Sequence, residues 1–354
     1  MQTVRELYRV EQLPIFQNRM HDTAQEARQC PRGNIRLVQN LATGLIYNDD
    51  FRPELMIYDE HYQNEQAVSA TFQHHLLSVS EIVGEAMGQY RLVEVGCGKG
   101  YFLEMLCKQG FDVIGFDPSY EGSNPRVRRH YFTPEIGMRA SGLILRHVLE
   151  HIQNPLEFIQ NLRHANGGEG LIYIEVPCFD WICKQRAWFD IFYEHVNYFR
   201  ICDFERMFGR ILNSGHLFGG QYLYVIADMA SLTIPNAIAE DLIEFPKNFS
   251  SEVDLYEITK DKKIAVWGGA SKGVIFALLS ERLGRPIDIV IDINPAKQGK
   301  FLPGTGVRVQ SPQEALAKLD KKAVIFVMNS NYLSEIIEMT NNEFEYIGVD
   351  SERL

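Results

Sequence analysis

Alternating glycines followed by a distant aspartate form the most informative chemical pattern of the sequence. Gly96, Gly98 and Gly100 come directly after the apolar run 92–95. Asp117 ends a second apolar run about twenty residues further on, the usual distance in nucleoside-binding βαβ units. A glycine turn at the end of one strand and a carboxylate at the end of the next build a cleft for a nucleoside. The alternative is a turn without a ligand, since strand-to-helix junctions favour glycine.

The spacing of the glycines distinguishes two kinds of nucleoside site. Dinucleotide sites read G-x-G-x-x-G, which places the pyrophosphate on a helix N-terminus. Here the third glycine comes one residue earlier, and Glu94 precedes the turn. This arrangement resembles motif I of the class I methyltransferases, which bind S-adenosylmethionine (SAM). We therefore expect Glu94, the three glycines, Asp117 and Pro118 to bind SAM, with Asp117 accepting hydrogen bonds from the ribose hydroxyls. A helix cap before Pro118 is the alternative role of Asp117.

Two histidines follow the third strand of this predicted unit, at 147 and 151. Ligands of open α/β sheets bind at the carboxyl ends of the strands. We expect His147 to line the cofactor site and His151 to face the substrate; local hydrogen bonding at a helix start is the alternative. A separation of one helical turn is also typical of a metal pair, but no third ligand is evident, so no metal is predicted.

An aromatic-rich segment, 192–199, places Glu194 beside His195. Histidine accepts a proton near neutral pH, and a neighbouring carboxylate raises its basicity. The segment follows a predicted strand, where loops carry function, so His195 is a candidate general base. The alternative is a buried polar pair that orders the loop.

The elements that position these residues alternate between strand and helix. A helix is predicted over 69–87, and strands with intervening helices continue from it to about residue 176. Such alternation predicts a parallel sheet that is covered on both faces. The predicted strands and helices are 91–96, 112–117, 141–146, 155–164 (helix), 171–176 and 201–212 (helix), followed by a hairpin at Gly219-Gly220.

A second βαβ unit opens with a strand at 263–267 and a turn at 268–273. Further strands are expected at 287–292 and 323–327. The turn and Asp292 imitate a dinucleotide site, although Gly268 and Gly269 are adjacent and do not fit G-x-G-x-x-G. Lys272 in this turn contacts a phosphate or is a solvated lysine at a helix start.

Composition excludes several classes of protein. The 354 residues are 45% hydrophobic and 23% charged, which is typical of a globular protein, and the net charge of −11 argues against nucleic acid. The chain shows neither a membrane-spanning run nor a signal core, so no membrane partner and a cytoplasmic location are expected. The six cysteines form no C-x-x-C pair, so no zinc is predicted.

At these residues the chain resembles the SAM-dependent C-methyltransferases of nucleotide-linked deoxysugars. The middle of the chain matches through 94–100, Asp117-Pro118, 147–151 and 193–199, and the last third through 268–273 and 292–305. The resemblance implies an α/β protein with a class I methyltransferase Rossmann-like sheet, a second Rossmann-like C-terminal domain and a small N-terminal module. The expected divisions are 1–72 (N-terminal module), 73–230 (SAM-binding domain), 231–260 (helical connector) and 261–354 (C-terminal substrate domain).

The resemblance also implies roles for individual residues. The residue matching His195 removes a proton from the carbon next to a sugar ketone, Glu194 orients it, and His151 contacts the sugar. Tyr62 is expected at the cofactor, and Tyr193 and Lys272 at the substrate. SAM is the expected cofactor, and the expected partner is a small molecule, a nucleotide sugar.

The chain departs from the family at three places. Only Cys30 lies in the N-terminal region where the family has a four-cysteine zinc site. Phe192 and Asn64 stand where the family has tyrosines. These departures leave open whether carbon or oxygen is methylated, so a SAM-dependent O-methyltransferase and, further off, a dinucleotide-dependent enzyme are the alternatives.

Overall fold

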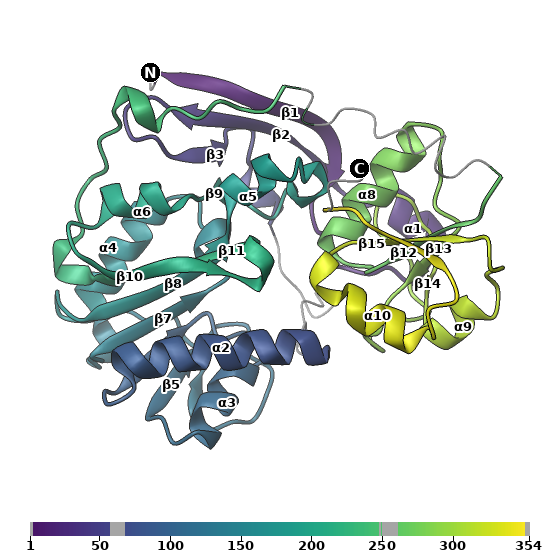
Figure 1. Cartoon of the computed structure of the whole chain (residues 1–354). Helices are drawn as coiled ribbons and strands as arrows, with labels where there is room; N and C mark the ends of the chain where they lie inside the picture. Colours follow the sequence, from purple (N-terminus) through teal and green to yellow (C-terminus); the bar gives the residue numbers. More distant parts are fainter. Residues whose placement is uncertain (1–2, 57–67, 248, 250–260, 351–354) are drawn as a thin grey trace.

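The computed structural model describes residues 3–56, 68–247, 249 and 261–350, which form three sheets (Figure 1). Tyr62 and Asn64 lie outside the described residues. In the N-terminal sheet the strands run antiparallel in the order β1-β2-β3-β9. Its elements are β1 (Val4–Pro14), α1 (Ala24–Arg28), β2 (Arg32–Asn40), β3 (Ile46–Asn48) and β9 (Asn197–Tyr198). Because β9 comes from a later part of the chain, the N-terminal module is completed by the domain that follows it.

The middle sheet has the order β10-β11-β8-β7-β4-β5-β6. The strands from β8 to β6 are parallel, and β11 is antiparallel to both of its neighbours. The strands are β4 (Leu92–Val95), β5 (Val113–Phe116), β6 (Val127–Arg128), β7 (Gly142–Arg146), β8 (Leu171–Pro177), β10 (Ile211–Leu217) and β11 (Tyr222–Asp228). The four strands expected from the apolar runs are therefore present, and Phe218–Gly220 forms the expected connection between β10 and β11.

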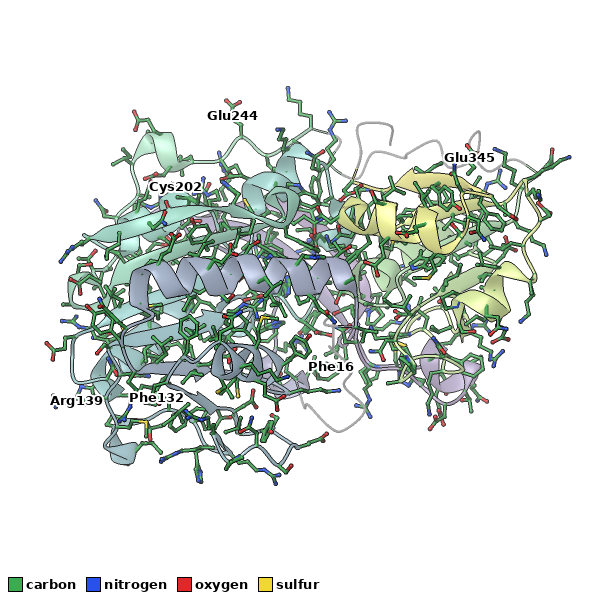
Figure 2. The ribbon with its side chains drawn as sticks, turned by 60° about the horizontal axis from the view of Figure 1, so that its bottom comes forward. Phe16, Phe132, Arg139, Cys202, Glu244 and Glu345 are labelled. Carbon is green, nitrogen blue, oxygen red and sulfur yellow. The ribbon has the colours of Figure 1, made fainter. Side chains whose placement is uncertain are left out.

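Helices cover both faces of the middle sheet. Successive residues of each strand point to opposite faces, so Val93 joins one apolar core and its neighbour Leu92 the other. The face of Leu92 is covered by α2 (Ala70–Met87) and α3 (Tyr101–Lys108), and α2 runs along the sheet in Figure 2. The opposite face packs against α4 (Pro155–Ala165), and two further helices are α5 (Phe179–Lys184) and α6 (Ile201–Met207).

The C-terminal sheet is parallel, with the order β14-β13-β12-β15-β16. Its elements are β12 (Ile264–Trp267), α8 (Ser271–Arg282), β13 (Ile289–Ile291), β14 (Val309–Gln310), α9 (Pro312–Leu316), β15 (Val324–Val327), α10 (Leu333–Met339) and β16 (Glu345–Gly348). This is the second Rossmann-like unit that the sequence predicts. It lies beside the middle domain (Figure 1).

Two expected helices differ from the structure. The helix expected over 201–212 ends at Met207, and the chain continues as β10 because Ile211 pairs with Ala227 of β11. The expected helical connector contains, in its described part 231–247, only short 3-10 turns. Ile243 hydrogen-bonds to Gln39 of β2, so tertiary contacts with the N-terminal sheet hold this stretch extended. No helix in the described part of the chain is long and apolar enough to cross a membrane.

Candidate active site

The glycine turn between β4 and α3 has the backbone that only glycine adopts easily. Gly96, Gly98 and Gly100 have φ angles of +71°, +53° and +80°. A Cβ at Gly96 would lie 2.5 Å from Cγ2 of Val148, so the turn packs closely against the segment that follows β7. At Gly98 no atom lies within 4 Å of such a Cβ. The turn is therefore open at its tip, where a ligand has room to approach the backbone.

Asp117, at the end of β5, fixes this turn. Its Oδ2 accepts a hydrogen bond of 2.8 Å from the Gly98 amide, and its Oδ1 accepts one of 2.8 Å from Ser119. The neighbouring Pro118 is exposed. The structure thus brings the carboxylate and the glycine turn together as the sequence predicts.

Glu94 lies beneath the turn in β4 and is buried. Burial raises the pKa of its carboxyl to about 7, opposed by Arg146 and reinforced by Asp117. Its Oε2 has no hydrogen-bond partner among the described residues. Buried polar atoms are normally hydrogen-bonded, so we expect this oxygen to accept a hydrogen bond from a ligand. The ammonium group of SAM is such a donor. The residues present therefore fit the cofactor.

A buried carboxylate, Glu175 of β8, organises the next strand end. It contacts four side chains: Arg146 (3.1 Å), Tyr173 (2.8 Å), His75 (2.8 Å) and His147 (3.2 Å). Burial by itself raises the pKa of Glu175, but Arg146 and the hydrogen bonds from the two histidines outweigh it and hold the pKa well below its usual range. Sequence reasoning missed Glu175 and His75, although a charged residue within the apolar run 171–176 was a signal.

His147 has a φ of +50°, which is rare for a residue with a side chain. Its Nδ1 lies 3.3 Å from Glu150 Oε1, and its Nε2 faces Glu175. Burial lowers its pKa, but the hydrogen bonds to the two carboxylates raise it to about 9. His147 is therefore an imidazolium at neutral pH.

A cavity of about 230 Å³ lies between the middle domain and the C-terminal unit. The segment 147–151 contributes His147, Glu150 and His151 to its wall, while Val148 of the same segment packs against Gly96. The segment 147–151 therefore lies between the cavity and the glycine turn. From the other side the cavity is lined by Gly268, Lys272 and Asn294 of the C-terminal unit.

His195 lies in this cavity wall and is only 8% exposed. Burial, together with His151, His147 and Lys272, holds its pKa well below the ordinary value, so the ring is neutral. The His195 ring centroid lies 4.0 Å from that of Phe192 and 5.0 Å from that of His151. A neutral imidazole in a cavity wall has a ring nitrogen that can accept a proton.

Glu194 lines the cavity, and both Glu194 and Tyr193 hydrogen-bond to the N-terminal module. The amides of Gln17 and Asn18 donate to Glu194 Oε1 over 2.5 and 3.3 Å. The Tyr193 hydroxyl accepts a hydrogen bond from the Arg52 amide, and the ring is fully buried. Tyr193 is not among the residues that line the cavity in the described part of the chain. The orienting role of Glu194 and the substrate contact of Tyr193 stay predictions.

Lys272 reaches across the cavity from the C-terminal unit. Its Nζ lies 3.0 Å from Asp190 Oδ2 and 3.1 Å from Gln221 Oε1, both in the middle domain. Asn294 is buried in the same wall, and its Nδ2 has no partner among the described residues. Asp292 repeats the arrangement of Asp117, because its Oδ2 accepts a hydrogen bond of 2.9 Å from Gly269. The second glycine turn is therefore fixed by its own aspartate and faces the same cavity.

Potential metal ligands also meet in this region. Two groups of three are close together in the described part of the chain: His75, His147 and Glu175, and Glu150, His151 and His195. Neither group can be recognised in the sequence. Members of the first group are far apart in the chain, and in the second group His195 is far from Glu150 and His151. In the first group both histidines already hydrogen-bond to Glu175.

The fold and the site define a SAM-dependent methyltransferase, and comparison with known proteins agrees. Residues 48–211 match the family described as methyltransferase domain, and residues 250–348 match the C-methyltransferase C-terminal domain. C-methyltransferase NovU of Streptomyces niveus is 24% identical over 330 residues, which cover 81% of this chain and 77% of NovU. The two family matches and this relative support a C-methyltransferase family, as the sequence resemblance implied.

Solved structures are similar to about half of the chain. The PH0226 protein of Pyrococcus horikoshii OT3 has a TM-score of 0.38 and 13% identity, covering 49% of this chain and 99% of that protein. Magnesium protoporphyrin IX methyltransferase of Synechocystis PCC 6803 with bound SAM has a TM-score of 0.33 and 16% identity, covering 47% and 86%.

Proposed function

We propose that this C-methyltransferase acts on a nucleotide-linked sugar and methylates the carbon next to a ketone, with His195 as the general base. The observation that carries the proposal is the position of His195. It is a neutral imidazole in the wall of a cavity that the SAM-binding domain and the C-terminal unit share.

When bound, SAM supplies a methyl group on an electrophilic sulfonium, held by Glu94, the glycine turn and Asp117. His195 takes the proton from the carbon next to the ketone, and the electron pair of the C–H bond stays on the substrate as an enolate. That carbon would be the nucleophile toward the methyl group that bound SAM would supply, and the electron pair of the broken C–S bond would remain on the sulfur. The protein's part is to bring the two reactants together and to exclude water.

The charges around His195 are compatible with an anionic nucleophile such as an enolate. Lys272 and the His147 imidazolium help to lower the pKa of His195. The same positive charges favour the negative charge that an enolate develops. They offer a substitute for the tyrosine hydroxyl that the family has where this chain has Phe192.

The sugar nucleotide is the substrate class that the family resemblance implies. Two features of the C-terminal wall support it. Lys272 offers a positive charge to a phosphate, and the buried Asn294 amide has a donor without a partner in the described part of the chain. We assign the nucleotide to this wall and the sugar to the wall that carries His151 and His195.

The test is turnover with SAM and a panel of nucleotide-linked sugars with and without a ketone, followed by mass spectrometry and NMR. We expect a new C–CH₃ group on a keto sugar, and deuterium uptake at that carbon in D₂O without SAM. His195→Asn should abolish both, while His164→Asn, on the exposed side of α4, should not. Methylation of a hydroxyl without deuterium uptake would instead establish an O-methyltransferase. Full activity of His195→Asn would reject the base.

A further inference from the structure

Three side chains meet in the cavity wall: Glu150, His151 and His195. One carboxylate oxygen of Glu150 and one ring nitrogen of each histidine lie within 4.8 Å of one another. All three residues line the cavity, and Glu150 is 1% exposed. A carboxylate other than that of the neighbouring Glu194 is therefore within reach of the proposed base.

Two hydrogen bonds to backbone carbonyls hold this cluster in place. The turn Leu149–His151 lies beside the segment 194–196. The Val196 amide donates to the Glu150 carbonyl over 2.8 Å, and His151 Nδ1 donates to the Glu194 carbonyl over 2.8 Å. Because a carbonyl oxygen can only accept, His151 Nδ1 is the donor in this bond. Residues that are far apart in the sequence are thus fixed against each other by two bonds.

Only one of the two carboxylate oxygens of Glu150 has a hydrogen-bond partner among the described residues. Its Oε1 faces His147 Nδ1 at 3.3 Å, whereas its Oε2 has no partner in the described part of the chain. His195 Nδ1 likewise has none among these residues. Buried polar atoms are normally hydrogen-bonded, so an unused acceptor and an unused ring nitrogen in one wall point to a partner gained during the reaction. Glu194, by contrast, accepts hydrogen bonds from backbone amides.

We propose that Glu150 is the positioning residue of His195, stabilising the imidazolium that forms when the base takes the substrate's proton. The inference rests on the proposed function of His195. The C–H bond of the substrate breaks, an N–H bond forms on His195, and the electron pair remains on the carbon. Glu150 takes no proton in this step and places its carboxylate near the new cation.

The charged groups around His195 set the direction of the expected pH effect. His147, His151 and Lys272 face it and lower its pKa, and Asp190 partly offsets Lys272 through their ion pair. Within the cluster the Glu150 carboxylate is the neighbour from which we expect an opposing effect, while Oε1 of Glu194 accepts hydrogen bonds from the Gln17 and Asn18 amides. Loss of the Glu150 charge therefore makes His195 a weaker base, so the acidic limb of the pH–rate profile moves to lower pH and the plateau falls.

The experiment compares Glu150→Gln with wild type in the full chain labelled with ¹⁵N-histidine. His195 is assigned by the signal that disappears in His195→Asn. We expect its titration midpoint to fall by about one pH unit in Glu150→Gln. We also expect kcat to fall by roughly tenfold or more, with SAM affinity unchanged by calorimetry. Glu157→Gln, an exposed change of the same charge on α4, should alter neither.

Glu150→Asp provides a second variant that keeps the charge if the amide variant does not fold. It should retain the His195 midpoint of wild type and recover part of kcat. An unchanged midpoint and pH profile in Glu150→Gln would overturn the proposal. So would Zn²⁺ retained stoichiometrically by wild type and lost in Glu150→Gln, because a metal would then occupy the cluster. Activity that survives in His195→Asn would reject His195 as the general base. This outcome concerns the proposed function and is distinguishable from the outcomes for Glu150.

Discussion

Lys272 Nζ lies 3.0 Å from Asp190 Oδ2, and this ion pair joins the C-terminal unit to the methyltransferase domain across the cavity. Both side chains are largely buried, and the ammonium also lies 5.0 Å from the centre of the Trp181 ring. The cavity walls therefore come from two separate domains, and the ion pair between Lys272 and Asp190 joins these walls. Substrate binding and the relative position of the two walls are expected to be linked at this lysine.

Lys272→Met tests that link. Because the variant removes the positive charge from the cavity wall, we expect KM for the nucleotide sugar to rise by roughly tenfold. SAM affinity should stay close to wild type, because the glycine turn of the middle domain is untouched. Steady-state kinetics and calorimetry measure the two quantities. Lys262→Met, which breaks a more exposed pair with Glu345, is the matched control. A KM equal to wild type would remove Lys272 from the substrate site.

Asp117→Asn tests the ribose contact. The variant keeps the shape of the side chain but loses the charge that strengthens its hydrogen bonds, each worth about 1.5–3 kcal/mol. We expect the Kd for SAM to rise by about tenfold to a hundredfold in calorimetry. Asp112→Asn, at an exposed ion pair just before β5, should leave it unchanged. Equal SAM affinity in the two variants would contradict the assignment of Asp117.

Gly96→Ala and Gly98→Ala separate backbone strain from steric conflict. Both positions have positive φ, but only the Cβ at Gly96 would collide with another side chain, that of Val148. We expect Gly98→Ala to cost about 1 kcal/mol of folding free energy, as for an alanine in a left-handed conformation. Gly96→Ala should cost more and should also weaken SAM binding. Urea unfolding and SAM titration measure both effects, and an equal loss in the two variants would contradict the packing described at Val148.

His147 predicts how stability depends on pH. Its pKa in the folded protein, about 9, lies above the ordinary value. Its stabilisation is therefore fully present below about pH 6.5 and is lost as the pH rises through 9. Between pH 7 and 9 we expect the free energy of unfolding to fall by about 1–3 kcal/mol more in wild type than in His147→Gln. Urea denaturation at several pH values checks this, and parallel curves for the two proteins would show that His147 is not held as a cation.

The sequence alone predicted the parts of the site that depend on local pattern. The order of strand, glycine turn, helix and aspartate appears in consecutive residues, so the positions of Gly96, Gly98 and Asp117 along the chain suffice to bring them together. The middle and C-terminal sheets followed from the same alternation. The helix expected over 201–212 differs because the pairing of β10 with β11 is a tertiary contact that overrides local helical pattern.

The environment of the base was decided by tertiary structure. Sequence adjacency suggested that Glu194 accompanies His195, and both residues line the cavity, but Oε1 of Glu194 also accepts hydrogen bonds from the Gln17 and Asn18 amides of the N-terminal module. Glu150 reaches the cluster because its turn packs beside the segment 194–196. Lys272 enters the same cavity from another sheet. Distances between residues so far apart in the chain depend on how whole elements pack, and no local pattern of residue types encodes them.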